Sequence, residues 1–400
     1  MGGPFSEIND TLFADKRMLE EEYQPETILE RDAEVEAYQH ALKDVLFGRN
    51  PANIFAYGKT GVGKTAVTKY MLAELATEAR RREAADDVHL LIHNCNGASV
   101  YGTLRSLIND LRPAGEDPFP KKGLSVGDAL EEFYARMDER GGTFLLVLDE
   151  IDHIDDPDPL LYDLPRARAN GHLETARVGV IGISNNYRFR ESLSPKVRDT
   201  LMEKEISFSP YDAGELVTIL EHRAERAYVE SACDGSAIRK AAALAARDTG
   251  GARQALDLLR TAGDLAEQRG DATVTDDHVG DAQEVVRRGR ITNKIRDQTI
   301  HGQLVLEAVT HLNEHGRTPA RSKEIQRAYE RTARNWDRPP LTTLRSVQSH
   351  LGDLHMLGFL ARYERNDGRD GGAYFEYDLN DIHPDAVVET REAIEAEYAE

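Results

Sequence analysis

Residues 58–65, with the sequence GKTGVGKT, decide how this chain folds. The octet follows an apolar run at 53–57 that has the length of a β-strand, and it opens the stretch TAVTKYMLAELA, which has helical periodicity. Glycines at such a turn let successive backbone N–H groups surround a phosphate, and the N-terminus of the next helix favours the anion. The octet therefore predicts a phosphate-binding loop. Its predicted nucleotide contacts are Gly58, Lys59, Thr60, Gly61, Val62, Gly63, Lys64, Thr65 and Ala66.

A second motif completes the predicted site. The stretch LLVLDE at 145–150 ends the most apolar strand-length run of the chain in two carboxylates. Asp149 can hold the water shell of Mg²⁺ together with the Thr65 hydroxyl, while Glu150 can polarise an attacking water. Lys64 would reach the β- and γ-phosphates. The two motifs predict a site for ATP and Mg²⁺, and they establish binding more firmly than turnover.

Apolar runs alternate with helical patterns through the first half of the chain. Strands that alternate with helices predict an α/β fold with a parallel sheet covered on both faces. From residue 212 to residue 288 the patterns are helical only, and the basic stretch RRGR at 287–290 is interpreted as a linker. The expected strands lie at 53–57, 88–93, 143–148, 177–183 and 205–208, and the expected domains are an ATPase base at 1–210, a helical lid at 211–290 and a third domain at 298–385.

The third domain has the pattern of a winged helix. Helical periodicity at 300–313, 322–334 and 341–357 is followed by ARYERNDGRDGGAYFEYDL, which alternates around a Gly/Asp-rich turn and predicts a hairpin. In such a domain the third helix enters the major groove and the wing lies against phosphates or the minor groove. The alternative is a module that binds protein. The predicted DNA contacts are Thr342, Arg345, Ser346 and Ser349 on the third helix, and Arg365 and Arg369 on the wing.

Composition limits the choice of function. The formal net charge is −21, and 12 of the 50 basic residues are lysine while 38 are arginine. Such an acidic, lysine-poor composition is typical of proteins that stay soluble at high salt, and it argues against a protein that simply coats nucleic acid. Two cysteines make no disulfide framework, and no run is apolar enough to span a membrane. We expect a cytoplasmic, nucleoid-associated protein with reduced thiols.

The ordered motifs resemble the AAA+ class of P-loop ATPases. That resemblance implies that Asn185, at the end of the run VGVIGISN, orients the lytic water, and that Arg253 in GGARQALDLLR reaches the nucleotide from the lid. An arginine in the first turn of a helix is unfavourable unless an anion lies nearby, which supports the second role. Tyr211 and Arg223 resemble lid residues that flank the bound nucleotide in one AAA+ branch; the alternatives are a core tyrosine and a solvated arginine.

One position departs from that branch. The segment LSPKVRDTL at 193–201 lies where the branch often carries an arginine that reaches the γ-phosphate of a neighbouring subunit. Here Lys196 takes the expected position, and Arg198 follows two residues later. Lysine lacks the planar, bidentate fork of arginine. We therefore expect slow turnover and a nucleotide-controlled switch rather than a fast motor.

The order of base, lid and winged helix is similar to that of the archaeal origin-recognition initiators of the Orc/Cdc type. The resemblance covers nearly the whole chain and implies binding to double-stranded origin DNA, recruitment of a replicative helicase of the MCM type and self-association on DNA. It also implies a second DNA contact from the ATPase domain, which we place at the basic turn with Lys121 and Lys122. The alternatives are a transcriptional regulator with an ATP switch, and a clamp-loader-like remodelling ATPase that uses the winged helix for protein contacts.

Overall fold

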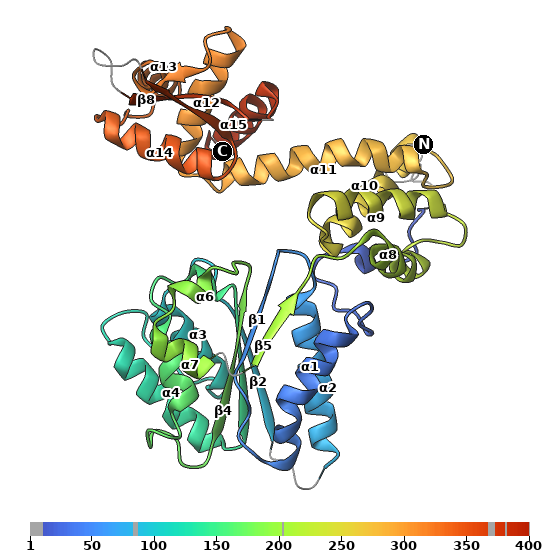
Figure 1. Ribbon diagram of the computed structural model, residues 1–400, viewed down its shortest axis with the longest axis vertical. Helices are drawn as coiled ribbons and strands as arrows, with labels where there is room; N and C mark the ends of the chain where they lie inside the picture. The colour runs from blue at the N-terminus through green and yellow to red at the C-terminus, as the bar shows by residue number, and fades with distance from the viewer. Residues whose placement is uncertain (1–10, 83–86, 202–203, 367–372, 381, 400) are drawn as a thin grey trace. The chain divides into compact units, whose positions relative to one another are not determined.

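The computed structural model describes residues 11–82, 87–201, 204–366, 373–380 and 382–399. The chain divides after Ala282 into two compact units. The first unit contains a parallel sheet with the strand order β2-β3-β4-β1-β5 (Figure 1). The five expected strands are therefore present: β1 Ile54–Gly58, β2 Val88–Asn94, β3 Thr143–Asp149, β4 Arg177–Ser184 and β5 Lys204–Phe208.

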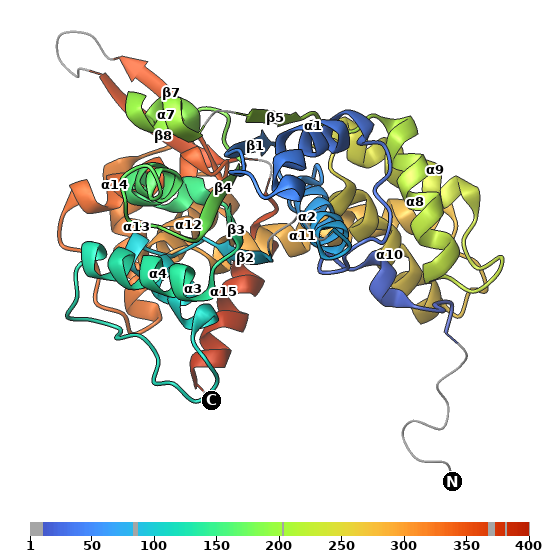
Figure 2. The same ribbon diagram turned by 90° about the horizontal axis from the view of Figure 1, so that it is seen from below.

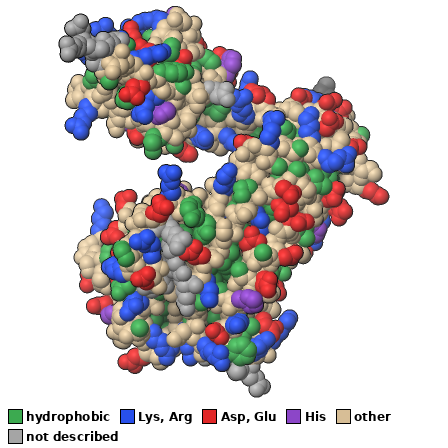
Figure 3. Space-filling view, viewed as in Figure 1, with side chains coloured by type: hydrophobic (Ala, Val, Ile, Leu, Met, Phe, Trp, Pro, Cys, Tyr) green, Lys and Arg blue, Asp and Glu red, His purple; other side chains and the backbone are tan. Residues whose placement is uncertain are grey.

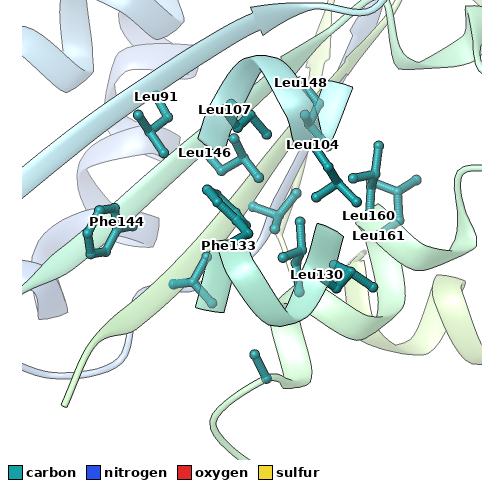
Figure 4. Packing of buried hydrophobic residues seen from close by; sticks show 14 of the residues in the cluster. Leu91, Leu104, Leu107, Leu130, Phe133, Phe144, Leu146, Leu148, Leu160 and Leu161 are labelled. Atoms are coloured by element: carbon teal, nitrogen blue, oxygen red, sulfur yellow. The ribbon is translucent and has the colours of Figure 1, made fainter. Parts of the chain in front are cut away.

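The sheet is buried on both faces because alternate side chains of β3 pack in opposite directions. Phe144, Leu146 and Leu148 belong to a core with helices on one side, whereas Leu145 and Val147 belong to a core on the other. Figures 1 and 2 show α3 and α4 over the first face and α1 and α2 over the second, and Figure 4 shows the first core from close by. An apolar run without alternation is the expected signature of such a strand. The helices are α1 Asp32–Leu42, α2 Lys64–Arg80, α3 Val100–Leu111 and α4 Val126–Arg140.

Short helices connect these elements around the sheet. They are η2 Lys43–Phe47, η3 Ile151–His153, η4 Pro159–Asp163, α5 Leu164–Arg166, α6 Phe189–Ser192 and α7 Pro195–Leu201.

A helical lid follows β5. Asp212 and Glu215 form the capping box that starts the first lid helix, with N···O distances of 2.9 and 2.8 Å between each backbone N–H and the other residue's carboxylate. The short helix η1, Lys16–Leu19, packs on the lid, against α8 and α10, although it lies within the segment 1–210 that we expected to form the base. The lid helices are α8 Ala213–Ala227, α9 Gly235–Asp248, α10 Ala252–Arg269 and α11 Asp276–Arg296.

The second unit is a winged helix with an additional C-terminal helix. A small sheet of order β6-β8-β7 joins the helices, and its pairings are antiparallel. Leu304, Tyr329 and Leu351 are fully buried in one core between three of these helices. The elements are α12 Ile300–Glu314, β6 Ala320–Arg321, α13 Ser322–Asn335, α14 Leu344–Met356, β7 Leu360–Asn366, β8 Ala373–Leu379 and α15 Pro384–Ala399.

A buried polar cluster fastens α15 to this core. The Arg391 guanidinium, with no exposed side-chain surface, donates to Glu307 Oε2 at 3.3 Å, Gln303 Oε1 at 2.7 Å and Glu395 Oε1 at 2.6 Å. Trp336 Nε1 donates to the same Glu307 carboxylate at 2.8 and 3.0 Å. Buried charges are tolerated where paired and hydrogen-bonded in this way.

His311 gives this cluster a pH dependence. Its hydrogen bond to Glu307, whose oxygen lies 3.5 Å from Nε2, is the main cause that raises the pKa of His311, and Glu314 adds to it. Because the folded state holds the proton more tightly, this stabilisation is complete below about pH 6.5 and is lost as the pH rises through the raised pKa.

We therefore expect the free energy of unfolding of wild type to exceed that of His311→Gln most clearly near about pH 6 and least near about pH 8. Urea unfolding followed by the fluorescence of Trp336, the single tryptophan of the chain, measures the difference. His40→Gln, at an exposed position of α1, serves as the control. A difference that grows with rising pH would contradict the assignment.

Three expectations about the helices are wrong in detail. The stretch at 287–290 is not a linker but part of α11, because Ile291 and Ile295 further along the helix pack against the winged-helix core. The third helix starts at Leu344 rather than 341, because Pro339 and Pro340 precede it and Thr343 caps it by accepting from Ser346 N. Ser322, whose residue type makes it a possible N-cap of the second helix, is instead the first residue of α13, and Arg321 takes the cap position.

Within the described ranges, no helix is both long enough and apolar enough to cross a bilayer.

Candidate functional site

The phosphate-binding loop has the predicted place between β1 and α2. Gly61 and Gly63 have φ angles of 81° and 92°, a region that side chains rarely adopt. A Cβ added to Gly63 would also lie 2.9 Å from the Tyr211 hydroxyl. The loop therefore needs glycine at these positions for both its backbone conformation and its close contact with the lid.

Lys64 is buried at the start of α2, with 5% of its surface exposed. Its Nζ donates to Gly58 O at 2.9 Å, Lys59 O at 2.7 Å and Asn185 Oδ1 at 2.8 Å. Burial lowers the pKa of Lys64 to about 8, although nearby carboxylates, Asp149 first, oppose the shift. The ammonium is thus held among neutral acceptors at the mouth of the loop.

The predicted catalytic side chains converge at the carboxyl ends of β3 and β4. Thr65 Oγ1 donates to Asp149 Oδ2 at 2.7 Å. Asn185 Nδ2 lies 3.5 Å from Glu150 Oε1, so that one amide faces both Lys64 and Glu150. Glu150 has a φ of 55°, which is strained for a residue with a side chain and is typical of functional positions. The structure therefore brings together Lys64, Thr65, Asp149, Glu150 and Asn185.

The lid closes over this centre from the other side. A cavity of about 420 Å³ is lined by the loop, by Asp149 and Glu150, and by the lid residues Tyr211, Arg223 and Arg253. The N-terminus of α10 touches the loop directly, since Ala252 N donates to Gly61 O at 2.9 Å. The predicted lid residues therefore line the same cavity as the predicted phosphate loop.

Arg31 is a residue of this site that we did not predict. Its buried guanidinium donates to Val62 O at 3.1 Å and to Ser209 O at 2.7 Å, and it stacks 3.5 Å from the centre of the Tyr211 ring. It therefore ties the phosphate loop, the end of β5 and the first lid residue together. The sequence around Arg31 shows only a charged residue next to the start of a helix. Its role is evident only from its contacts with residues that are distant in sequence.

Lys196 is engaged within its own chain. Its Nζ lies 3.5 Å from Asp158 Oδ2 and 4.8 Å from the centre of the Tyr162 ring. Arg198, two residues further along α7, is exposed. That this position lacks the arginine that would reach the γ-phosphate of a neighbouring subunit stays a prediction.

The predicted DNA contacts of the second unit lie largely at the surface. Arg345 and Ser349 are exposed on α14, whereas Ser346 Oγ is hydrogen-bonded to the capping Thr343 hydroxyl at 2.8 Å. Thr342 is exposed just before the helix. On the wing, Arg365 Nε donates to Glu376 Oε2 at 3.1 Å, and Arg369 lies outside the described residues.

The turn with Lys121 and Lys122 connects α3 and α4. Both lysines are exposed, while Phe119 beside them is buried and its carbonyl accepts from Arg105 Nε at 2.9 Å. Tyr101 Oη donates to Pro120 O at 2.8 Å. The turn is therefore held at its base and presents two cations at its tip.

Fold and site together define an AAA+ ATPase with a helical lid and a winged helix, and three segments of the chain match known families in that order. Residues 27–175 match the AAA ATPase domain, residues 217–284 the Cdc6 AAA+ ATPase-type lid domain, and residues 293–390 the CDC6 C-terminal winged helix domain.

The relatives identify the family. The chain is 50% identical over 370 residues to ORC1-type DNA replication protein 8 of Halobacterium salinarum, which covers 92% of this chain and 93% of that protein. It is 42% identical to ORC1-type DNA replication protein 11 of Haloarcula marismortui, over 96% and 91% of the two chains. The solved structure of the Aeropyrum pernix Orc1 protein in complex with DNA superposes with a TM-score of 0.84 at 33% identity, over 96% of this chain and 97% of that one. This chain belongs to the ORC1-type DNA replication protein family.

Family membership confirms the resemblance to archaeal origin-recognition initiators and the predicted fold class. The roles of the single residues are not tested by these matches and stay predictions.

Proposed function

We propose that this protein is an ATP-dependent initiator of DNA replication that binds double-stranded origin DNA and helps recruit a replicative helicase of the MCM type. The observation that carries the proposal is the junction of base and lid at one cavity, in a chain that also has a winged helix. A nucleotide in that cavity would contact both the base and the lid, so its binding is coupled to the position of the lid relative to the base.

The residues of the cavity fit ATP with Mg²⁺. Lys64 offers a buried cation without a carboxylate in hydrogen-bonding contact, and the turn with Gly61 and Gly63 offers backbone donors at the N-terminus of α2. Thr65 and Asp149 present two oxygens 2.7 Å apart, a pair that suits one Mg²⁺ ion and its water shell. The bound metal would offset charge on the phosphates.

The remaining side chains supply positions for hydrolysis. Glu150 would accept a proton from the attacking water, and the Asn185 amide beside it would orient that water. Arg253 would stabilise negative charge on the terminal phosphate from the lid. Because Lys196 replaces the expected arginine, turnover by a single subunit is slow, and the protein acts as a switch between nucleotide states.

The winged helix would recognise the base sequence of the origin DNA. Arg345 is exposed in the first turn of α14, where side chains of such helices reach base edges in the major groove. Arg365 on the wing, and Lys121 and Lys122 in the first unit, would contact the DNA backbone or the minor groove. The net charge of −21 confines such contacts to local cationic sites, and Figure 3 shows Lys and Arg side chains interspersed with Asp and Glu on the face that it draws.

We expect Arg345→Ala to weaken binding to the preferred sites by about 5- to 100-fold and to flatten the preference between sequences, because a bidentate base contact contributes about 1–3 kcal/mol of discrimination. Chromatin mapping in the native cells, followed by binding assays on the recovered fragments, measures both effects. Arg49→Ala is the matched control, since Arg49 is an exposed arginine in front of β1 that forms an ion pair with Asp44 and lies over the Phe47 ring.

The outcomes separate the competing functions. Enrichment at repeat-rich origins that Arg345→Ala removes supports initiation. Enrichment at promoters supports the transcriptional alternative. Loss of origin binding to the same degree in Arg49→Ala would show that general electrostatics, and not α14, determines recognition.

A further inference from the structure

The segment at residues 11–24, which we call the N-terminal strap, joins the lid to the phosphate loop. Its first part is fixed to the lid, because Phe13 stacks on Tyr228 with 4.8 Å between ring centres and Leu12 N donates to Glu267 at 2.7 Å. Its last residue is fixed to the first turn of α2, directly after the loop, because Gln24 Nε2 donates to Ala66 O at 3.0 Å. Between these two attachments the strap runs along the nucleotide cavity and contributes Glu20 to Gln24 to its lining.

At the middle of the strap, Glu21 meets the lid arginine. Glu21 Oε1 lies 2.5 Å from Arg253 Nη2, and about half of each side chain is exposed. Arg253 stands next to the phosphate loop, since a Cβ added to Gly61 would lie 3.3 Å from Arg253 Cβ. The guanidinium that would receive the terminal phosphate is therefore paired with a carboxylate of the strap.

A second contact between the strap and a lid arginine lies two residues further along, at Tyr23. The Arg223 guanidinium stacks 4.2 Å from the centre of the Tyr23 ring. Arg223 is buried, and its Nη1 has no hydrogen-bond partner among the described residues. Both lid arginines of the cavity thus contact the strap, one through a carboxylate and one through an aromatic ring.

We propose that Glu21 is a specificity-determining residue, which lowers the affinity of the site for a nucleoside triphosphate but leaves the affinity for a diphosphate unchanged. Its carboxylate and the terminal phosphate of a triphosphate compete for Arg253. The terminal phosphate carries more charge and more acceptor oxygens than one carboxylate, so it displaces Glu21. A diphosphate, whose β-phosphate is held by the loop and Lys64, leaves the pair of Glu21 and Arg253 in place.

The strap would then report the nucleotide state. With a diphosphate, Glu21 holds the middle of the strap against the lid; with a triphosphate, that contact is released while Phe13 and Gln24 stay attached. Binding of the triphosphate must break the ion pair between Glu21 and Arg253, whereas binding of the diphosphate leaves it intact. Glu21 therefore lowers the affinity for the triphosphate only. This inference rests on the proposed ATP site.

The test compares Glu21→Gln with Glu22→Gln. Glu22 lines the same cavity, carries the same charge and has no ion pair or hydrogen bond among those found for the described residues, so it controls for general repulsion of phosphates. Affinities for Mg-ATP and Mg-ADP are measured by calorimetry. We expect Glu21→Gln to tighten ATP binding by about two- to five-fold, the range of an exposed ion pair, with a smaller change for ADP and no such selectivity in Glu22→Gln.

Two further measurements complete the test. In an Arg253→Ala background, Glu21→Gln should no longer change the ratio of the two affinities. Hydrogen exchange at residues 20–23 should be faster with a non-hydrolysable ATP analogue than with ADP. Equal effects of the two substitutions, an equal change for both nucleotides, or a selectivity that persists without Arg253 would overturn the role of Glu21. Absence of any nucleotide binding by wild type would instead overturn the proposed function.

Discussion

Replacing Lys64 by alanine is expected to weaken the binding of Mg-ATP by about 100-fold or more. The reason lies in how the ammonium is held: it is buried, and its three hydrogen-bond acceptors, two carbonyls and the Asn185 amide, are all neutral. A buried cation without a directly bonded anion interacts strongly with a phosphate, and hydrogen bonds to charged groups contribute about 1.5–3 kcal/mol each. Loss of about 3 kcal/mol corresponds to a factor of about 100.

Calorimetry with ATP and ADP measures this effect, and Lys43→Ala is the matched control. Lys43 is an exposed lysine at the start of η2, remote from the residues that line the cavity. Lys64→Met, which keeps most of the side-chain volume, separates loss of charge from loss of packing. An affinity within two-fold of wild type in both Lys64 variants, with the fold intact by circular dichroism, would refute the assignment of the phosphate loop.

Local sequence patterns predicted most of this fold because its decisive elements are local. The phosphate loop depends on glycines within one octet, and β3 depends on an apolar run that both faces of the sheet bury. The capping box at Asp212 and the hairpin after residue 359 are likewise encoded within a few residues. Convergence of Asp149 and Asn185 follows from the rule that parallel strands end at one edge of the sheet.

What escaped prediction depends on contacts between distant segments. Arg31 and Val62 are 31 residues apart, and Glu21 is far in sequence from Arg253, so neither pair leaves a periodic signal. The strap lies within the segment expected to form the base, and nothing in its sequence indicates that it packs on the lid. Helix α11 continues through a stretch that the sequence suggested was a linker, and the burial of Ile295 and packing of Ile291 beyond that stretch depend on the distant winged-helix core.

The largest loss of stability is expected at Arg391, on the helix α15 that the sequence did not reveal. Arg391→Ala would leave Glu307 buried, with 6% of its side chain exposed, and without its guanidinium partner. Removing one member of a buried ion pair typically costs about 3–5 kcal/mol because the remaining charge stays desolvated. We therefore expect the free energy of unfolding of the second unit to fall by that amount.

Arg296→Ala, which removes a different ion pair to α15, is the matched control. Arg296 of α11 binds Glu397 of α15 through two hydrogen bonds of 3.0 and 2.7 Å, but both side chains are exposed, so water screens the pair and its loss costs little stability. Urea unfolding of the full chain, followed by Trp336 fluorescence and circular dichroism, compares the variants. Because Trp336 contacts the cluster, midpoints rather than amplitudes are compared.

The double variant Arg391→Met with Glu307→Leu sharpens the argument. If the cost of Arg391→Ala comes from the unpaired carboxylate, removing both charges should restore much of the lost stability, since apolar replacements of buried ion pairs are often neutral. If it comes from lost packing of α15 alone, the double variant should be no more stable than the single one. A loss in Arg391→Ala no larger than in Arg296→Ala would show that α15 is not fastened by this cluster.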